Sequence, residues 1–276
     1  MLEETQPTPG WRAGRLAGPL LLAAFALTLG AWLAYTPPGL LGKADAIGYA
    51  ICHRIDLRSF HLGDRPLPLC ARCTGIYLGA LAGTVTLLAL GRRRAGGLPP
   101  TPLLVVLVGF IAVMGADGLN SYLTLFPNGP HLYEPNNALR LVTGTFNGLA
   151  VGALLLPVFN QTVWRDWEPR PSLASYRELG VLALVGAGVC ALVLTEQPLV
   201  LYPLAVLSAL GVLLLLTMLY TVAVVVLTGQ QNRLTTWRQA ALPALAGLTL
   251  ALLQIAAIDA VRYALFGTWA GFPLGR

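Results

Sequence analysis

Residues 199–228 read LVLYPLAVLSALGVLLLLTMLYTVAVVVLT and contain no charged side chain. A helix needs about 20 predominantly apolar residues to cross the hydrocarbon core of a bilayer, so this segment is long enough to span a membrane. Its apolar residues are continuous and do not alternate with polar ones, which excludes a strand of a membrane β-barrel. Similar runs occur at about residues 16–35, 71–90, 103–120, 138–158, 178–195 and 240–264. The sequence therefore predicts an all-α polytopic membrane helix bundle of about seven transmembrane helices.

The composition excludes an ordinary soluble domain. Of the 276 residues, 56% are hydrophobic and 11% are charged, whereas about 25% of the residues of a soluble domain are charged. The net charge of +6 comes from basic loops between the apolar runs, so it reflects membrane topology and no nucleic-acid partner is expected. Membrane lipids are the expected surroundings, and residues 1–15 are expected to form a polar N-terminal tail.

The basic residues gather in alternate loops and so predict an orientation. They precede the first span and follow the second, fourth and sixth spans, at Arg12, Arg15, Arg92, Arg93, Arg94, Arg165, Arg170, Arg177, Arg233 and Arg238. The loops at 121–137 and 196–198 contain no Lys or Arg. Because basic loops stay on the cytoplasmic side, this pattern predicts that the N-terminus is inside and the C-terminus outside.

One predicted outer loop, together with the helix after it, concentrates the reactive side chains. Residues 52–79, CHRIDLRSFHLGDRPLPLCARCTGIYLG, contain three of the four cysteines, two of the three histidines and four arginines. Cys70 and Cys73 are three residues apart at the predicted start of a helix, and Tyr77 follows one turn later on the same side. The helix dipole and the nearby Arg72 favour the thiolate form, which both metal binding and disulfide chemistry require.

The first hypothesis for this segment is a metal site, with zinc or a similar divalent metal as the expected ion. Cys70 and Cys73 would supply two thiolate ligands and Cys52 a third. The usual arrangement pairs two C-x2-C motifs, whereas here the upstream half is Cys-His. The fourth ligand is expected from one of three residues, His53, His61 or Asp117. Of these, His53 completes the predicted set of Cys52, His53, Cys70 and Cys73.

Two other hypotheses remain open. A membrane thiol–disulfide oxidoreductase would use Cys70 and Cys73, with quinone as a possible acceptor. Its layout is similar to that of bacterial quinone-linked disulfide-forming proteins and vitamin K epoxide reductases, which carry an additional cysteine pair. Here only Cys52 remains, because Cys190 lies within the fifth span as a small apolar residue. The third hypothesis is a disulfide that only stabilises the outer loop.

Polar side chains in other spans converge on the same predicted membrane face. They are Asp117, Asn137, Arg140, Asp259 and Arg262, all in the outer halves of their spans or at their outer ends. A charge at the centre of a membrane helix costs about 2.5–3.5 kcal/mol, so such groups usually face the bundle and pair with one another. We therefore expect a shared polar site next to the cysteines.

The arginines near the cysteines predict an anion site. The loop 36–70 is basic although it lies outside, contrary to the charge rule. We expect an anionic group or a lipid headgroup to be bound by Arg58, Arg72 and Arg140. The supporting polar residues are Tyr77, Asp117 and Asn137.

Small residues predict close helix packing. Gly75, Gly79 and Gly83 form two overlapping G-x-x-x-G steps within the predicted span 71–90. Such steps let the backbones of two membrane helices approach closely.

Four strings also carry a family resemblance: CHR at 52–54, PLCARCTGIYLG at 68–79, ADGLN at 116–120 and NNALRLVTGTFNGL at 136–149. Over roughly residues 45–160 the chain resembles the prokaryotic integral membrane family called domain of unknown function 2085. The resemblance implies a multi-pass protein of the prokaryotic cell (inner) membrane and brings no particular activity. It points to Cys52, His53, Arg58, Cys70, Arg72, Cys73, Gly75, Tyr77, Asp117, Asn137 and Arg140.

The expected organisation has four parts. The polar tail 1–15 is followed by a first transmembrane helix at 16–35. A cysteine-motif core at 36–160 contains the second to fourth helices, and a C-terminal extension at 161–276 contains three more.

Overall fold

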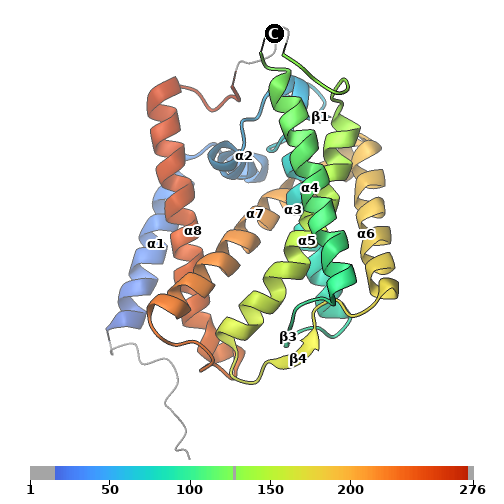
Figure 1. Cartoon of the computed structure of the whole chain (residues 1–276). Helices are drawn as coiled ribbons and strands as arrows, with labels where there is room; N and C mark the ends of the chain where they lie inside the picture. The colour runs from blue at the N-terminus through green and yellow to red at the C-terminus, as the bar shows by residue number, and fades with distance from the viewer. Residues whose placement is uncertain (1–15, 127–128, 273–276) are drawn as a thin grey trace, which may run out of the picture.

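The computed structural model describes residues 16–126 and 129–272. Within these residues, seven helices are long and apolar enough to cross a membrane, which confirms the predicted all-α polytopic bundle (Figure 1). They are α1 (Ala17–Tyr35), α3 (Ala71–Ala89), α4 (Thr101–Leu123), α5 (Asn137–Val163), α6 (Tyr176–Leu194), α7 (Pro198–Leu227) and α8 (Trp237–Phe266). Each coincides with one of the apolar runs predicted from the sequence.

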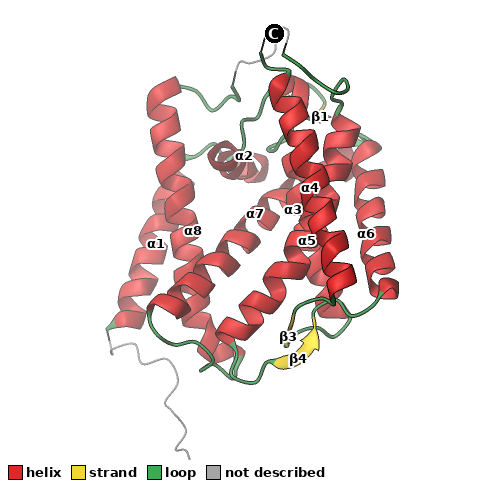
Figure 2. Ribbon diagram, viewed as in Figure 1, coloured by secondary structure: helices red, strands yellow, loops and turns green. Residues whose placement is uncertain are grey.

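An eighth helix, α2 (Gly39–Ile51), was not predicted. It has 13 residues, too few to span a bilayer, and it packs against α7 and α8 at one end of the bundle (Figures 1 and 2). Its N-cap residue is Pro38, whose ring has no N–H to leave unpaired at a helix start. The buried side of α2 carries Ala44, Ile47 and Tyr49, so α2 belongs to the packed core.

Short elements make the connections at the two ends of the bundle. The chain passes from α2 through a 3₁₀ turn (Asp56–Arg58) and an antiparallel pair, β1 (His61–Leu62) and β2 (Arg65–Pro66), before it enters α3. A parallel pair, β3 (Ala95–Gly97) and β4 (Glu168–Pro171), joins two connections at the other end (Figure 2). The basic loops that follow α3 and α5 therefore lie at the end of the bundle opposite α2.

The closest helix pair is α3 against α5, and glycines on both helices allow it. Gly75 and Gly79 of α3 face the backbone of α5, while Gly144 and Gly148 of α5 face the backbone of α3. A Cβ at any of these four positions would lie within 3.0 Å of a facing backbone atom. This confirms the close packing predicted from the G-x-x-x-G steps. It fixes the start of α3, with its cysteines, against the start of α5.

The C-terminal helices complete the bundle around α3. Gly211 of α7 lies against the backbone carbonyl of Tyr77 on α3, and Gly247 of α8 packs against α7. Helix α1 contacts α8 and contributes a single buried side chain, Trp32. Helix α7 therefore lies against the start of α3, close to the cysteine segment, and α8 packs beside it.

Candidate metal centre

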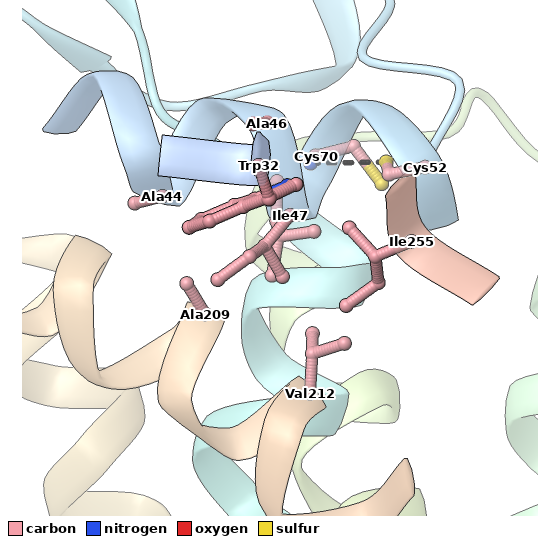
Figure 3. Close-up of a cluster of buried hydrophobic side chains, with 10 residues drawn as sticks. Trp32, Ala44, Ala46, Ile47, Cys52, Cys70, Ala209, Val212 and Ile255 are labelled. Atoms are coloured by element: carbon pink, nitrogen blue, oxygen red, sulfur yellow. Dashed lines mark hydrogen bonds between the residues drawn. The ribbon is translucent and has the colours of Figure 1, made fainter. Parts of the chain in front are cut away.

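Three cysteine sulfurs meet where α2 ends and α3 begins. Cys52 is the C-cap residue of α2, Cys70 is the N-cap residue of α3, and Cys73 lies in the first turn of α3. The three Sγ atoms lie within 4.8 Å of one another. Cys52 and Cys70 are buried, with 4% and 2% of their surface exposed. Figure 3 shows the two sulfurs beside each other at the edge of a buried apolar cluster.

The chain between these cysteines is folded back so that both ends reach one point. Gly63, with φ of 64°, turns the β1–β2 hairpin, which is a left-handed conformation that glycine adopts without strain. The last turn of α2 then lies directly on the segment before α3, because a side chain at Gly48 would collide with the carbonyl of Pro68. Cys52 and Cys70 are therefore brought together by backbone contact.

Two backbone N–H groups point at the sulfur of Cys52. Those of Arg54 and Cys70 donate to Cys52 Sγ, each over 3.4 Å. Arg54 adopts a left-handed φ of 53°, unusual for a side chain of its size. The neighbouring thiols of Cys70 and Cys73, together with the backbone N–H of Cys70, lower the pKa of Cys52 well below its ordinary value. Cys52 is thus the sulfur best prepared to carry negative charge.

Among the described residues, the three-sulfur group contains none of the predicted fourth ligands, which were His53, His61 and Asp117. Nδ1 of His53 accepts a hydrogen bond from the backbone N–H of Ile55 at 2.9 Å. Burial lowers the pKa of His53, which favours its neutral form. His61 instead pairs with Asp56 at 3.1 Å near the surface. The fourth cysteine, Cys190 on α6, bonds to Thr145 and is also outside the group.

Asp117 is occupied by other partners. It forms a buried ion pair with Arg72, whose Nε lies 3.2 Å from Asp117 Oδ2. Its carboxylate also accepts from the hydroxyl of Tyr133 at 2.8 Å and from Thr143 at 3.3 Å. Asp117 therefore lies beside the cysteine segment, where it is the ion-pair partner of Arg72.

The other two predicted arginines lie near this pair. Arg58 donates to the carbonyl of Ser121 at 2.8 Å, and Arg140 donates to Asn137 at 2.9 Å. Both line a cavity of about 290 Å³ together with Thr124. Arg140 is 6% exposed, and its Nε has no hydrogen-bond partner within the described chain.

The supporting residues take different positions. Asn137 donates to the carbonyls of Leu57 and Ser59 at 3.3 Å, which ties α5 to the loop after α2. Tyr77 is half-buried and packs against the apolar cluster that contains the cysteines.

Two residues near the site were not among the predicted metal or anion ligands, although Arg262 was expected in the shared polar site. Arg262 of α8 donates to the carbonyl of Cys52 at 2.7 Å, so the last helix holds the first cysteine in place. Asp45 of α2 pairs with Arg54 at 2.8 Å and with Arg65. In the sequence, Arg262 stood out only as a charge within a predicted span. Asp45 did not stand out because it lies on α2, which was not predicted.

The chain is similar to a family of membrane proteins and to two archaeal proteins. The family model described as "Predicted membrane protein (DUF2085)" matches residues 52–154. An uncharacterized protein of Methanocaldococcus jannaschii is 28% identical over 123 residues, which are 45% of this chain and 72% of that protein. An uncharacterized protein of Methanothermobacter thermautotrophicus is 32% identical over 104 residues, 38% of this chain and 83% of that protein. No solved structure matches.

Proposed function

The chain belongs to the DUF2085 family of predicted membrane proteins, and we propose that it binds a zinc-type divalent metal ion through the sulfurs of Cys52, Cys70 and Cys73. The observation that carries this proposal is the convergence of the three Sγ atoms within 4.8 Å. They come from two segments joined by a folded loop, so their meeting is a property of the tertiary structure. Soft thiolate ligands of this kind favour zinc among the common divalent ions.

The spacing of the sulfurs suits such an ion. With Zn–S bonds of about 2.3 Å, the sulfurs of a tetrahedral site lie about 3.8 Å apart. The three Sγ atoms lie within 4.8 Å of one another, so small side-chain rotations would bring them to this spacing. The N–H groups of Arg54 and Cys70 would continue to donate to Cys52 Sγ and so stabilise its thiolate. A bound divalent ion would let all three sulfurs be ionised side by side.

Three protein ligands leave one tetrahedral position for a fourth group. His53, next to Cys52 in the sequence, is the candidate in the predicted ligand set, and a rotation of its ring would be needed to bring Nε2 into the group. Without that rotation the fourth position is open to water or another small ligand, as in catalytic zinc sites, where the metal polarises what it binds.

An anion site beside the metal site is the second part of the proposal. Arg58 and Arg140 line the same cavity, and the unpartnered Nε of Arg140 is a buried donor. A buried guanidinium group beside a half-buried one is suited to a phosphate or carboxylate. A lipid phosphate is the anion most available to a membrane protein. Arg72 would act indirectly, through its ion pair with Asp117.

Metal content tests the proposal directly. The full chain is purified in a neutral detergent and its metals are measured by mass spectrometry. We expect about one zinc per chain, lost in Cys70→Ser and Cys73→Ser. Cys190→Ser is the matched control, because its thiol bonds to Thr145 outside the group, and it should retain the metal. Retention of metal in Cys70→Ser would contradict the proposal.

Thiol–disulfide chemistry is the alternative function. The observation that favours it is the position of Cys70 and Cys73 at the start of α3, with their sulfurs within 4.8 Å of that of Cys52. Thiol counting on the same samples separates the two. No metal, together with a cysteine pair that switches between thiol and disulfide when quinone is added, would favour redox chemistry. A pair that stays oxidised would leave a stabilising disulfide.

A further inference from the structure

A cavity of about 670 Å³ lies between α1 and α8, and its lining includes none of the three clustered cysteines. Figure 1 shows these two helices side by side, and they are in contact. The cavity is lined near the C-terminal ends of both helices by four aromatic side chains, Trp32, Tyr35, Tyr263 and Trp269. Tyr35 and Tyr263 are also exposed, so the cavity reaches the surface.

One acidic side chain lies in this mainly apolar and aromatic lining, which also contains Thr28 and Thr36. Asp259 of α8 is 3% exposed and belongs to the lining of the cavity. Its Oδ2 accepts from Nε1 of Trp32 at 3.3 Å. Its Oδ1 has no hydrogen-bond partner within the residues that the structure describes. A buried carboxylate oxygen in a membrane protein is costly without a partner, which makes Asp259 a candidate binding group.

The cations near Asp259 are committed elsewhere. Arg262, one helical turn away, donates to the carbonyls of Tyr49 and Cys52 and stacks over the ring of Tyr49 at 4.0 Å. Lys43 donates to carbonyls at the end of α1, at Leu33 and Thr36. Arg54 pairs with Asp45 at 2.8 Å. Among the described residues none of these three cations forms an ion pair with Asp259, and a bound ligand would supply the matching charge.

The aromatic wall is held in place by its neighbours. The ring of Trp269 lies 5.1 Å from that of Tyr49 and 5.3 Å from that of Tyr263. Its backbone carbonyl accepts from Arg54 at 2.9 Å. Aromatic faces attract ammonium groups, and the attraction grows when water is excluded. The wall and Asp259 together therefore provide the two features that recognise an organic cation.

We infer that the α1–α8 cavity binds an amphiphile with an ammonium head and a hydrocarbon tail, with the head at Asp259 and the tail along the apolar wall. The ammonium pairs with the unpartnered Oδ1, and the rings of Trp32, Tyr263 and Trp269 surround it. Two sources share this chemistry: an aminophospholipid of the bilayer and a free amphiphilic amine.

Native mass spectrometry of the full chain in neutral maltoside micelles tests the inference, with dodecylammonium as the probe and dodecanol as its uncharged analogue. We expect Asp259→Asn, which keeps the shape and removes the charge, to weaken dodecylammonium binding by about tenfold or more. Dodecanol binding should not change. The matched control Glu196→Gln removes an exposed acid between α6 and α7 and should behave as the unsubstituted chain.

The same measurement distinguishes the two sources. Preferential retention of phosphatidylethanolamine over phosphatidylglycerol, abolished by Asp259→Asn, assigns the site to a lipid. Binding of dodecylammonium alone assigns it to a free amine. Equal dodecylammonium binding by Asp259→Asn, or equal affinity for dodecanol, overturns the inference. If Asp259→Asn does not fold, Ala260→Phe keeps the test, because it fills the cavity from an exposed position and should remove dodecylammonium binding.

Discussion

Arg262 of α8 donates to the backbone carbonyl of Cys52 at 2.7 Å, across 210 positions of sequence. The same guanidinium group stacks over the rings of Tyr49 and Phe272, at 4.0 and 4.2 Å from their centroids. The last helix of the chain, which lies beyond the matched family region, thus fixes the end of α2 and with it the first cysteine of the proposed metal site. This gives the C-terminal helices a structural role in that site.

Replacing this arginine should loosen the site. Arg262→Gln keeps a donor but loses the charge and most of the stacking, and hydrogen bonds from charged groups contribute about 1.5–3 kcal/mol each. We expect a lower melting temperature in detergent and weaker retention of zinc during dialysis. Arg238→Gln, at an exposed position in the first turn of the same helix, is the control. Unchanged zinc retention in Arg262→Gln would contradict the assigned role.

The glycine contact between α3 and α5 should be the part of the bundle most sensitive to added volume. Gly79→Ala places a Cβ against the backbone of Thr145, which cannot rotate away as a side chain would. Overpacking of this kind costs about 1–3 kcal/mol. We expect earlier unfolding with increasing temperature or denaturing detergent, measured by circular dichroism.

Gly109→Ala on α4 is the matched control, because a Cβ there meets nothing within 4 Å. The higher helix propensity of alanine should then leave stability unchanged or raise it by up to about 1 kcal/mol. Equal effects of the two substitutions would mean that the close approach of α3 and α5 does not limit stability.

The properties that the sequence predicted well are local ones. Run length and the scarcity of charge identified all seven spans, and the spacing of Gly75 and Gly79 predicted a close helix contact. Helix α2 was not predicted, because its 13 residues are too few for a span and include the charged residues Lys43 and Asp45. The meeting of Cys52 with Cys70 could be proposed from residue types.

Other contacts depend on the tertiary fold and carry no local signal. The left-handed turn at Arg54 directs a backbone N–H to the sulfur of Cys52, and Nδ1 of His53 is taken by the N–H of Ile55. Asp117 could equally have been a metal ligand or the partner of an arginine. Only the tertiary structure, in which α3 and α4 both pack against α5, shows that Arg72 is its partner.

The orientation in the membrane is a prediction from loop charge, and it needs probes at exposed positions. Cys52 and Cys70 are buried, so labelling of the native thiols would be slow on either side. Leu57→Cys near the cysteine end and Arg93→Cys at the opposite end are both exposed sites. A membrane-impermeant maleimide added to intact cells should label Leu57→Cys and spare Arg93→Cys until the membrane is opened. The reverse pattern would place the cysteine end inside.

Removal of the metal should make the cysteines reactive. In the bound state three sulfurs are shielded by coordination, and metal affinity falls on acidification because protons compete for the thiolates. A strong chelator at mildly acidic pH should therefore release zinc, lower the melting temperature and raise the rate at which thiols of the folded protein react with a coloured disulfide reagent. Cys73→Ser should be unstable and chelator-insensitive, whereas Cys190→Ser should respond as the unsubstituted chain does. A melting temperature that the chelator leaves unchanged, in protein shown to have lost its zinc, would mean that the metal does not join α2 to α3.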